Sequence, residues 1–389
     1  LSFGDATIWS CLGVQKGDPL GPLLFSLVFR EVWRATEAAL AARGLPPLRG
    51  RGSFLDDLAF GGSLATSRAT LDCFVVAARE VGLELNLAKC EVICADAAAA
   101  ADLFPGMRVL PPEDWSLLGM PCGDRAHAEV FVDEALERAA KKLRSLASLD
   151  ETHVGFTLVR FCASFPLSVF FARATGPLPA FAGFDDALLG AVSSLLGPLA
   201  PKQWAQTLLP CRLGGLGLRS SAQHAAVAFI SASASSERLL PLFFPPATLE
   251  TLAAADPWLA PALACPHLRS APLAADKAAE YLRSGLARFG DGGQKMLSAL
   301  VDASSHATLL EGASLVTIAR MHSCAAPYSA VWLAPVASAL GAPPVFFAPN
   351  LFSALVEGDV SKFVCAPLYP SRRAVAPAPI PQPPPTGAS

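Results

Sequence analysis

Charge is scarce in this sequence: 16% of its 389 residues are charged, whereas 52% are hydrophobic. The net charge is -3 and the isoelectric point is about 6.1. The chain therefore lacks the overall basic character of proteins that coat nucleic acids, and any contact with nucleic acid must come from local patches. The hydrophobic fraction excludes an intrinsically disordered chain. A chain of this length can instead form roughly two or three domains with large cores.

The ten cysteines lack the spacing of a metal site. None forms a Cys-x-x-Cys pair, the closest two are Cys90 and Cys94, and no histidine cluster accompanies them. This pattern argues against a structural zinc site and favours buried free thiols. Free thiols are typical of a reducing compartment. We therefore expect an intracellular protein, nuclear or cytoplasmic.

Long unbroken apolar runs are absent too. Residues 325–356 carry no charge, but five prolines interrupt them, and Arg160 interrupts the apolar stretch 154–171. Neither is the uninterrupted run of ~20 apolar residues that a membrane span needs, which favours packed alanine-rich helices and no membrane partner. The chain opens at Leu1 with no basic region or cleavage site, so we expect no secretory signal and a start within a longer polypeptide.

The N-terminal residues predict a short hairpin, with a Gly-Asp turn, followed by a glycine-rich bend. The bend, GVQKGDPLGPLLF at 13–25, leads into a helix that Asp18 or Gly21 can cap. Gly17 leaves room for a nucleotide or a template strand against the backbone. A strand-to-helix turn also needs glycine and proline for purely structural reasons, so the bend alone is a weak signal.

The most distinctive stretch is RGSFLDDLAFGG, at 51–62. Apolar residues recur at the strand period around an acidic pair, which predicts a tight β-hairpin with two carboxylates at its bend: Phe54, Leu58 and Phe60 around Asp56 and Asp57. Such a pair is a candidate cation site, but most Asp-Asp dipeptides are solvated turn residues. The letters FDD recur at 184–186 at a predicted helix start, so the dipeptide alone does not decide between these interpretations.

The remainder of residues 1–125 predicts an α+β layout. Thr66 is expected to cap a helix that runs to Val81. Lys89 precedes a strand around Val92, and a second short strand is expected at 115–123. Strands and helices would then alternate around a small antiparallel sheet.

Beyond residue 125 the pattern is helical. Apolar residues at helical spacing begin an amphipathic helix near residue 126, and LLPCRLGGLGLRS at 208–220 predicts a structural turn, not a phosphate loop. Further helices are expected at 154–174, 184–196, 221–233, 276–289 and 294–303. We divide this part into a helical region at 126–205, a mostly helical region at 206–370 and a disordered proline-rich tail at 371–389.

Four ordered motifs resemble the palm of reverse transcriptases, most closely those of non-LTR retrotransposons. They are GVQKGDPLGPLLF at 13–25, FLDD at 54–57, LNLAKCEVI at 85–93 and SLLGMPCG at 116–123. The resemblance implies a partial polymerase palm in residues 1–125, followed by a helical thumb. It also implies template-directed DNA synthesis from an RNA template, a DNA primer and deoxynucleoside triphosphates.

The resemblance assigns roles residue by residue. Asp56 and Asp57 match the hairpin carboxylates that bind catalytic Mg²⁺. Lys89 stands where the family often has a lysine near the leaving pyrophosphate, and Leu118 and Gly119 lie in the primer-grip region. The positions that match the nucleotide- and template-binding segments are Gln15, Gly17, Asp18, Pro19 and Phe54.

The resemblance also implies a third carboxylate. Reverse transcriptases need another aspartate, on a strand before the glycine-rich motif, to hold two metal ions, and Asp5 lies in a predicted turn instead. We therefore expect an incomplete two-ion Mg²⁺ site and no activity from this chain alone. The alternatives are a catalytically dead retroelement remnant that acts as a helical interaction protein, or one that binds nucleic acid through Arg49, Arg51, Lys141, Lys142 and Arg144.

Overall fold

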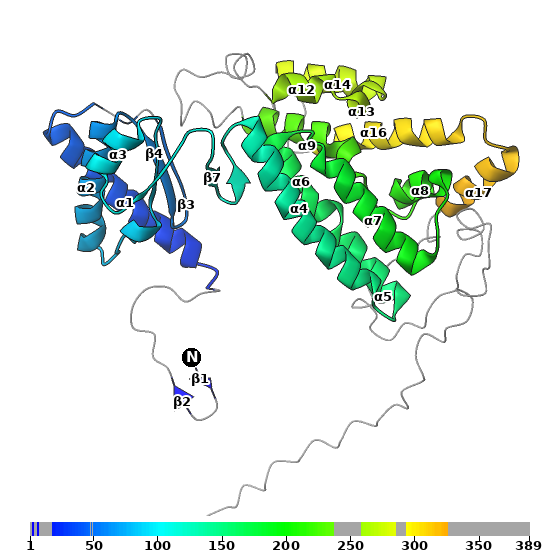
Figure 1. Ribbon diagram of the computed structural model, residues 1–389, viewed down its shortest axis with the longest axis horizontal. Coiled ribbons are helices and arrows are strands. Elements are labelled where there is room, and N and C mark those ends of the chain that lie inside the picture. The colour runs from blue at the N-terminus through cyan, green and yellow to red at the C-terminus, as the bar shows by residue number, and fades with distance from the viewer. Residues whose placement is uncertain are drawn as a thin grey trace, which may run out of the picture. The chain divides into compact units, whose positions relative to one another are not determined.

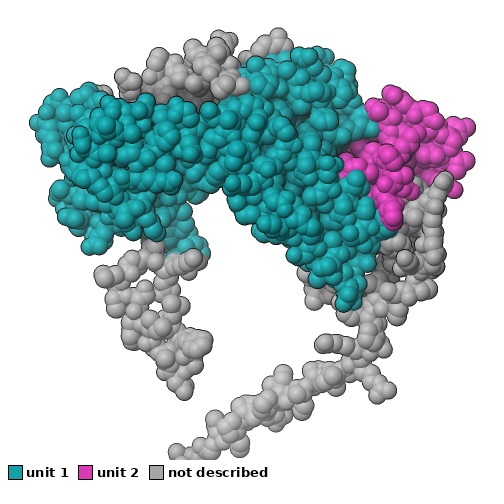
Figure 2. Space-filling view, in the orientation of Figure 1, with its two compact units in different colours: residues 1–197, 219–305 teal, residues 198–218, 306–389 magenta. Residues whose placement is uncertain are grey.

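The computed structural model describes residues 18–46, 48, 50–236, 258–284 and 293–325, with two short strands, β1 (Ser2–Phe3) and β2 (Ala6–Thr7). The chain divides into two compact units, residues 1–197 with 219–305 and residues 198–218 with 306–389 (Figure 2). Helices predominate in the described residues (Figure 1), and the strands there form small two-stranded sheets. This agrees with a helix-rich α+β class. The division into palm, thumb and C-terminal region stays a prediction.

The strands do not form the one antiparallel sheet that the sequence predicted. β1 pairs with β2 as an antiparallel hairpin, as expected, but β5 (Glu91–Ile93) pairs in parallel with β6 (Arg108–Leu110). The helix α3 (Ala97–Leu103) lies between them in the chain, and a parallel pair requires such a crossover. The strand at Val92 was predicted correctly, but a short strand does not specify its partner.

Two helices hold one face of the acidic hairpin. α1 (Gly21–Ala42) and α2 (Leu64–Glu80) pack together and against the hairpin of β3 (Gly50–Phe54) and β4 (Asp57–Gly61). Their shared core contains the buried residues Phe29, Val32, Trp33, Phe74, Ala77 and Ala78, with Leu58 and Phe60 packed against it. Burying a large apolar side chain stabilises the fold by about 1.5–3 kcal/mol, so this core fixes the hairpin on α1.

The start of α2 differs from the sequence prediction. Ser63, not Thr66, is the N-cap, and its Oγ accepts a hydrogen bond of 3.1 Å from the backbone N–H of Thr66. Thr66 lies inside the first turn and is buried. Both residue types can cap a helix, so the sequence pattern alone misplaced the helix start by a few residues. The helix ends before Gly82, whose φ is 78°, as predicted.

The helical part of the larger unit begins with α4 (Arg125–Ala147), which buries the predicted apolar stripe. The single helix expected at 154–174 is instead broken into α5 (Thr152–Leu158), a π-helical turn η2 (Val159–Ala163) and α6 (Phe165–Thr175). Pro166 follows the break, and a proline has no backbone N–H to donate to the carbonyl oxygen four residues before it, so it fits the first turn of a new helix and not the interior of a continuous one. The segment Thr152–Thr175 is long and apolar enough to cross a membrane, and 33% of its most apolar window is buried within the protein.

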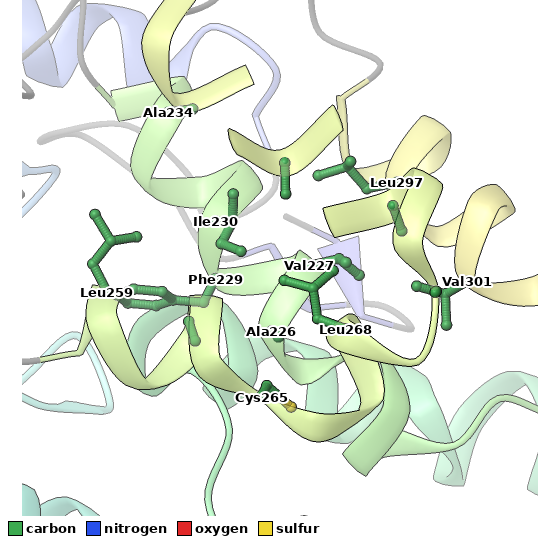
Figure 3. Close-up of a cluster of buried hydrophobic side chains, with 14 residues drawn as sticks. Ala226, Val227, Phe229, Ile230, Ala234, Leu259, Cys265, Leu268, Leu297 and Val301 are labelled. Atoms are coloured by element: carbon green, nitrogen blue, oxygen red, sulfur yellow. The ribbon is translucent and has the colours of Figure 1, made fainter. Parts of the chain in front are cut away.

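The core of this helical part surrounds α9 (Ser221–Ser236), which is buried along most of its length. Figure 3 shows Phe229 and Ile230 of α9 among side chains from α12 (Leu259–Ala264), α13 (Pro266–Arg269) and α16 (Gly293–Leu310). α14 (Pro272–Ser284) adds Ala274 and Ala278. A helix that is apolar all round is typical of such a central position.

A buried ionic group joins α9 to α16. His224 and Asp302 are each 2% exposed, and His224 Nε2 lies 3.1 Å from Asp302 Oδ1. Arg219 Nη2 lies 3.3 Å from Asp302 Oδ2. The other ring nitrogen of His224 lies 3.1 Å from the carbonyl oxygen of Ser220. The carboxylate of Asp302 is thus partnered by both His224 and Arg219, and a buried charge requires such partners.

The smaller unit contains α8 (Pro201–Leu208), the 3-10 turn η3 (Cys211–Leu213) and α17 (Leu315–Ala325). The glycine-rich loop is structural, as predicted. Gln206 Nε2 donates a hydrogen bond of 2.8 Å to the carbonyl oxygen of Gly214, and a Cβ at Gly215 would lie 2.1 Å from the carbonyl oxygen of Leu209. Neighbouring backbone therefore lies too close to Gly215 for any side chain there, which is a structural reason for the glycine.

The described cysteines are free thiols, as predicted, but their burial is uneven. Cys73, Cys265 and Cys324 are buried, whereas Cys162 is exposed. Burial raises the pKa of the Cys324 thiol to about 11. The prediction of buried thiols is therefore confirmed for those three and wrong for Cys162, and the remaining described cysteines are only partly buried, namely Cys90, Cys94, Cys122 and Cys211.

Candidate functional site: the acidic hairpin

The predicted hairpin is present, with Asp56 in its loop and Asp57 as the first residue of β4. Phe54 pairs with Asp57 across the end of the ladder, and Leu55 and Asp56 form the two-residue loop. Leu55 adopts φ 55°, a left-handed conformation that costs an L-residue roughly 1–2 kcal/mol. Such strain persists only where the surrounding structure imposes it. Here the paired strands and the packing against α1 hold the tight turn that presents Asp56.

The two faces of the hairpin differ. Directly paired residues share a face, so Leu58 and Phe60, which pack on the α1–α2 core, define the inner face. The Phe54–Asp57 pair lies on the opposite, outer face. The other pairs on that face are Gly52–Ala59 and Gly50–Gly61. Phe54 is 65% exposed, and both aspartates are exposed. Among the described residues, the outer face is therefore exposed at the tip of the hairpin, where Phe54 and the two aspartates lie.

The carboxylates of Asp56 and Asp57 are available as ligands. Within the described residues, neither forms an ion pair or a side-chain hydrogen bond. Carboxylate oxygens suit Mg²⁺, which is usually held by one or two carboxylates together with phosphates and water. The described part of the chain contains no group of three or more His, Cys, Asp or Glu side chains placed to hold a metal ion. The hairpin thus offers two adjacent carboxylates to a cation.

Asp18 and Pro19 form the turn that starts α1. The Oδ1 atom of Asp18 accepts a hydrogen bond of 2.9 Å from the backbone N–H of Leu20, and its carbonyl oxygen accepts one of 3.0 Å from Gly21. The side chain of Asp18 therefore stabilises the turn, while Asp18 and Pro19 remain exposed. Gln15 and Gly17 lie outside the described residues.

Lys89 is the last residue of the 3-10 turn η1 (Leu87–Lys89), directly before Cys90 and β5. Its side chain is exposed and forms no ion pair among the described residues. Leu83 and Leu85, just upstream, pack against the α1–α2 core, so this core anchors the segment that leads to Lys89. A pyrophosphate-binding role for Lys89 stays a prediction.

The segment at 115–123 is a hairpin and not the single strand that was predicted. β7 (Ser116–Leu117) pairs with β8 (Met120–Pro121), and Leu118 and Gly119 form the loop with φ of 52° and 75°. Positive φ at both positions is typical of a type I′ turn. The primer-grip candidates Leu118 and Gly119 thus form an exposed hairpin tip.

The base of this second hairpin is fixed to the start of α4. The backbone N–H of Asp124 donates to the carbonyl oxygen of Glu113 at 2.9 Å, and His127 Nδ1 lies 2.9 Å from Asp114 Oδ1. β8 also packs against α4 and α6. The tip therefore projects from a well-supported base.

The sequence FDD at 184–186 contains a second aspartate pair, Asp185 and Asp186, whose surroundings differ from those of the hairpin pair. The helix α7 (Ala180–Leu196) begins four residues before the predicted start, so Asp185 lies inside it. The carboxylate of Asp185 accepts hydrogen bonds from Ser220 Oγ at 2.5 Å, from Ser221 N at 2.7 Å and from Ala222 N at 3.1 Å. Burial raises the pKa of this carboxyl group. Asp185 thus caps α9, whereas the Asp56–Asp57 pair has no such partners in the described structure.

A cavity beside the hairpin was missed in the sequence. It has a volume of about 340 Å³ and is lined by Ser26, Phe29, Arg30, Trp33, Arg34, Glu37, Arg51, Ser53 and Leu55. The first six lie on one face of α1, and the others alternate along β3 and its turn. Arg30 lies three residues before Trp33, and Arg34 lies three residues before Glu37, a spacing that places such pairs on one face of a helix; the sequence prediction gave these side chains no role. No protein-family model matches the chain, and no curated protein matches it.

Proposed function

We propose that residues 1–125 are part of a reverse-transcriptase palm, in which Asp56 and Asp57 bind the Mg²⁺ that serves template-directed DNA synthesis. The observation that carries this proposal is the hairpin itself: two exposed carboxylates at a tight turn, on an open face, anchored to the helix that follows the glycine-rich bend. Turn aspartates that only stabilise backbone would use their oxygens locally, as Asp18 does.

The second hairpin supports the same proposal. Leu118 and Gly119 form an exposed type I′ tip at the end of the palm-like part and directly before α4. A hairpin at this border matches the position of the primer grip in the family that the motifs resemble. The following helices would then belong to the thumb.

The chemistry explains the roles that we assign. In two-metal nucleotidyl transfer one ion activates the primer hydroxyl, while the other holds the triphosphate and stabilises the leaving pyrophosphate. Asp56 and Asp57 would contribute oxygen ligands, and Lys89 would offset charge on the pyrophosphate. The hairpin offers only two carboxylates, and adjacent carboxylates repel each other. We therefore expect weak binding of one ion, and catalysis only with a further carboxylate from outside the described residues.

The test is primer extension by a longer polypeptide in which an upstream palm strand precedes residue 1, on an RNA template with Mg²⁺. Asp56→Asn and Asp57→Asn should each abolish extension. Asp186→Asn, which removes an exposed carboxylate from the second FDD sequence, should leave extension intact. Extension that survives both hairpin substitutions would reject the assignment.

A further inference from the structure

The cavity between α1 and β3 lies on the opposite side of the hairpin from Asp57. Arg51 and Ser53 pair with Phe60 and Leu58, the inner-face residues of β4. A ligand in this cavity would therefore occupy a different face from a metal ion bound by Asp57. Its volume of about 340 Å³ lies at the lower end of the roughly 300–1,000 Å³ range of small-molecule pockets.

The charges of the cavity favour an anion. Its lining contains three guanidinium groups, those of Arg30, Arg34 and Arg51, and one carboxylate, that of Glu37. Glu31, outside the lining, lies 3.0 Å from Arg30 and 3.1 Å from Arg34, and the hydrogen bond from Arg30 lowers its pKa. Three positive groups against two negative ones leave a net positive charge.

The arginines are already positioned. Arg51 Nη1 lies 2.6 Å from Glu37 Oε1, and its guanidinium carbon is 4.9 Å from the centre of the Trp33 ring. Arg30 and Arg34 are held by the one carboxylate of Glu31. A ligand that meets preordered side chains loses less free energy to their ordering.

We propose that this cavity binds the phosphate of a nucleotide, either free or within a single strand. Guanidinium groups match phosphate geometry through paired N–H donors. The apolar wall of Phe29, Trp33 and Leu55 suits the sugar and base that accompany the phosphate. The site is separate from the proposed metal site and needs no divalent ion.

The experiment measures binding of a fluorescein-labelled single-stranded RNA to the full chain by anisotropy, in low salt with a chelator present, and uses AMP as competitor. Displacement by AMP identifies a free-nucleotide site, whereas RNA binding that AMP does not displace identifies a strand site. Absence of binding by both probes overturns the proposal. Because no divalent ion is present, the result does not depend on metal binding by Asp56 and Asp57. Failure of this proposal is therefore distinguishable from failure of the proposed metal site.

Matched variants assign the binding to the cavity. Arg34→Glu should weaken binding on the order of tenfold and reduce the slope of log K against log salt by about 1 or more. Arg138→Glu makes the same charge change on α4, where the side chain is 64% exposed against 63% for Arg34, and should have little effect. Equal weakening by the two variants would show a general charge effect and refute the site.

For a second pair of variants we expect a change of RNA affinity in the opposite direction. Glu31→Gln removes the carboxylate shared by Arg30 and Arg34 and should tighten binding severalfold. Glu134→Gln makes the same change beside Arg138 and should not. Unchanged binding with Glu31→Gln would contradict the role of Arg30 and Arg34.

Discussion

Replacing Asp185 with alanine should destabilise the helical part of the larger unit. The carboxylate accepts three hydrogen bonds at the N-terminus of α9, from Ser220 Oγ, Ser221 N and Ala222 N. The first N–H groups of a helix have no partner within the helix. Because α9 forms the centre of the buried cluster in Figure 3, disorder at its start would affect the surrounding helices.

The magnitude follows from these contacts. Loss of a cap costs about 0.5–2 kcal/mol, and each buried donor left without a partner costs about 1–3 kcal/mol. Burial opposes this, because it disfavours the charged carboxylate and raises the pKa of Asp185. We expect a net loss of about 2–3 kcal/mol and a fall in Tm of about 4–12 °C.

The raised pKa of Asp185 also determines how its contribution to stability depends on pH. A carboxyl group whose pKa is higher in the folded state favours folding most when it is protonated, below its ordinary value of 3.8. That contribution is lost as pH rises from 3.8 through the raised pKa. Because Asp185→Asn cannot titrate, the stability of the wild type relative to this variant should decrease over the same interval.

Urea unfolding followed by circular dichroism measures both effects. The control is Asp186→Ala, which makes the same change at the adjacent exposed position on α7 and should alter stability by about 0.5 kcal/mol or less. Equal losses at Asp185 and Asp186 would refute the capping role. A constant difference between wild type and Asp185→Asn across pH would refute the effect of burial.

Three further predictions rest on single positions. Gly123→Ala should lower the free energy of unfolding by about 1–3 kcal/mol in thermal unfolding, because the added Cβ would lie 1.9 Å from the carbonyl oxygen of Glu113. The control is Gly190→Ala on α7, where a Cβ would meet nothing within 4 Å; it should raise the free energy of unfolding by about 0.5–1 kcal/mol. Asp302→Ala should cost about 3–5 kcal/mol in the same assay because His224 loses its buried partner, and a neutral result would exclude that pair as a stabilising contact. In mass-spectrometric thiol labelling at neutral pH, exposed Cys162 should react well before Cys324, whose pKa is raised to about 11; equal rates would contradict the burial of Cys324.

Local patterns predicted the elements of the fold better than their partners. The hairpin at 50–61 followed from alternation around a polar turn, and α4 followed from apolar spacing. The parallel pairing of β5 with β6 and the break before α6 were not predicted. Strand pairing depends on contacts between distant residues, and the π-helical turn depends on packing, so neither follows from local propensity.

The candidate site shows the same division. The sequence placed Asp56 in a tight turn with Asp57 beside it, and the structure agrees. It placed the second FDD sequence in a helix but gave Asp185 no role, because the partners of Asp185 lie some 35 residues away in Ser220 and its neighbours. The cavity lined by Arg34 and Arg51 was missed for the same reason: it exists only where α1 meets β3.

The binding of Mn²⁺, used in place of Mg²⁺, tests the central claim most directly. Electron paramagnetic resonance on the full chain measures the free ion, and thus the affinity, for wild type, Asp56→Asn, Asp57→Asn and the control Asp186→Asn. We predict one weak site that each hairpin substitution weakens by on the order of tenfold or more, and that Asp186→Asn leaves unchanged. Equal binding by the wild type and both hairpin variants would contradict a metal site at Asp56 and Asp57.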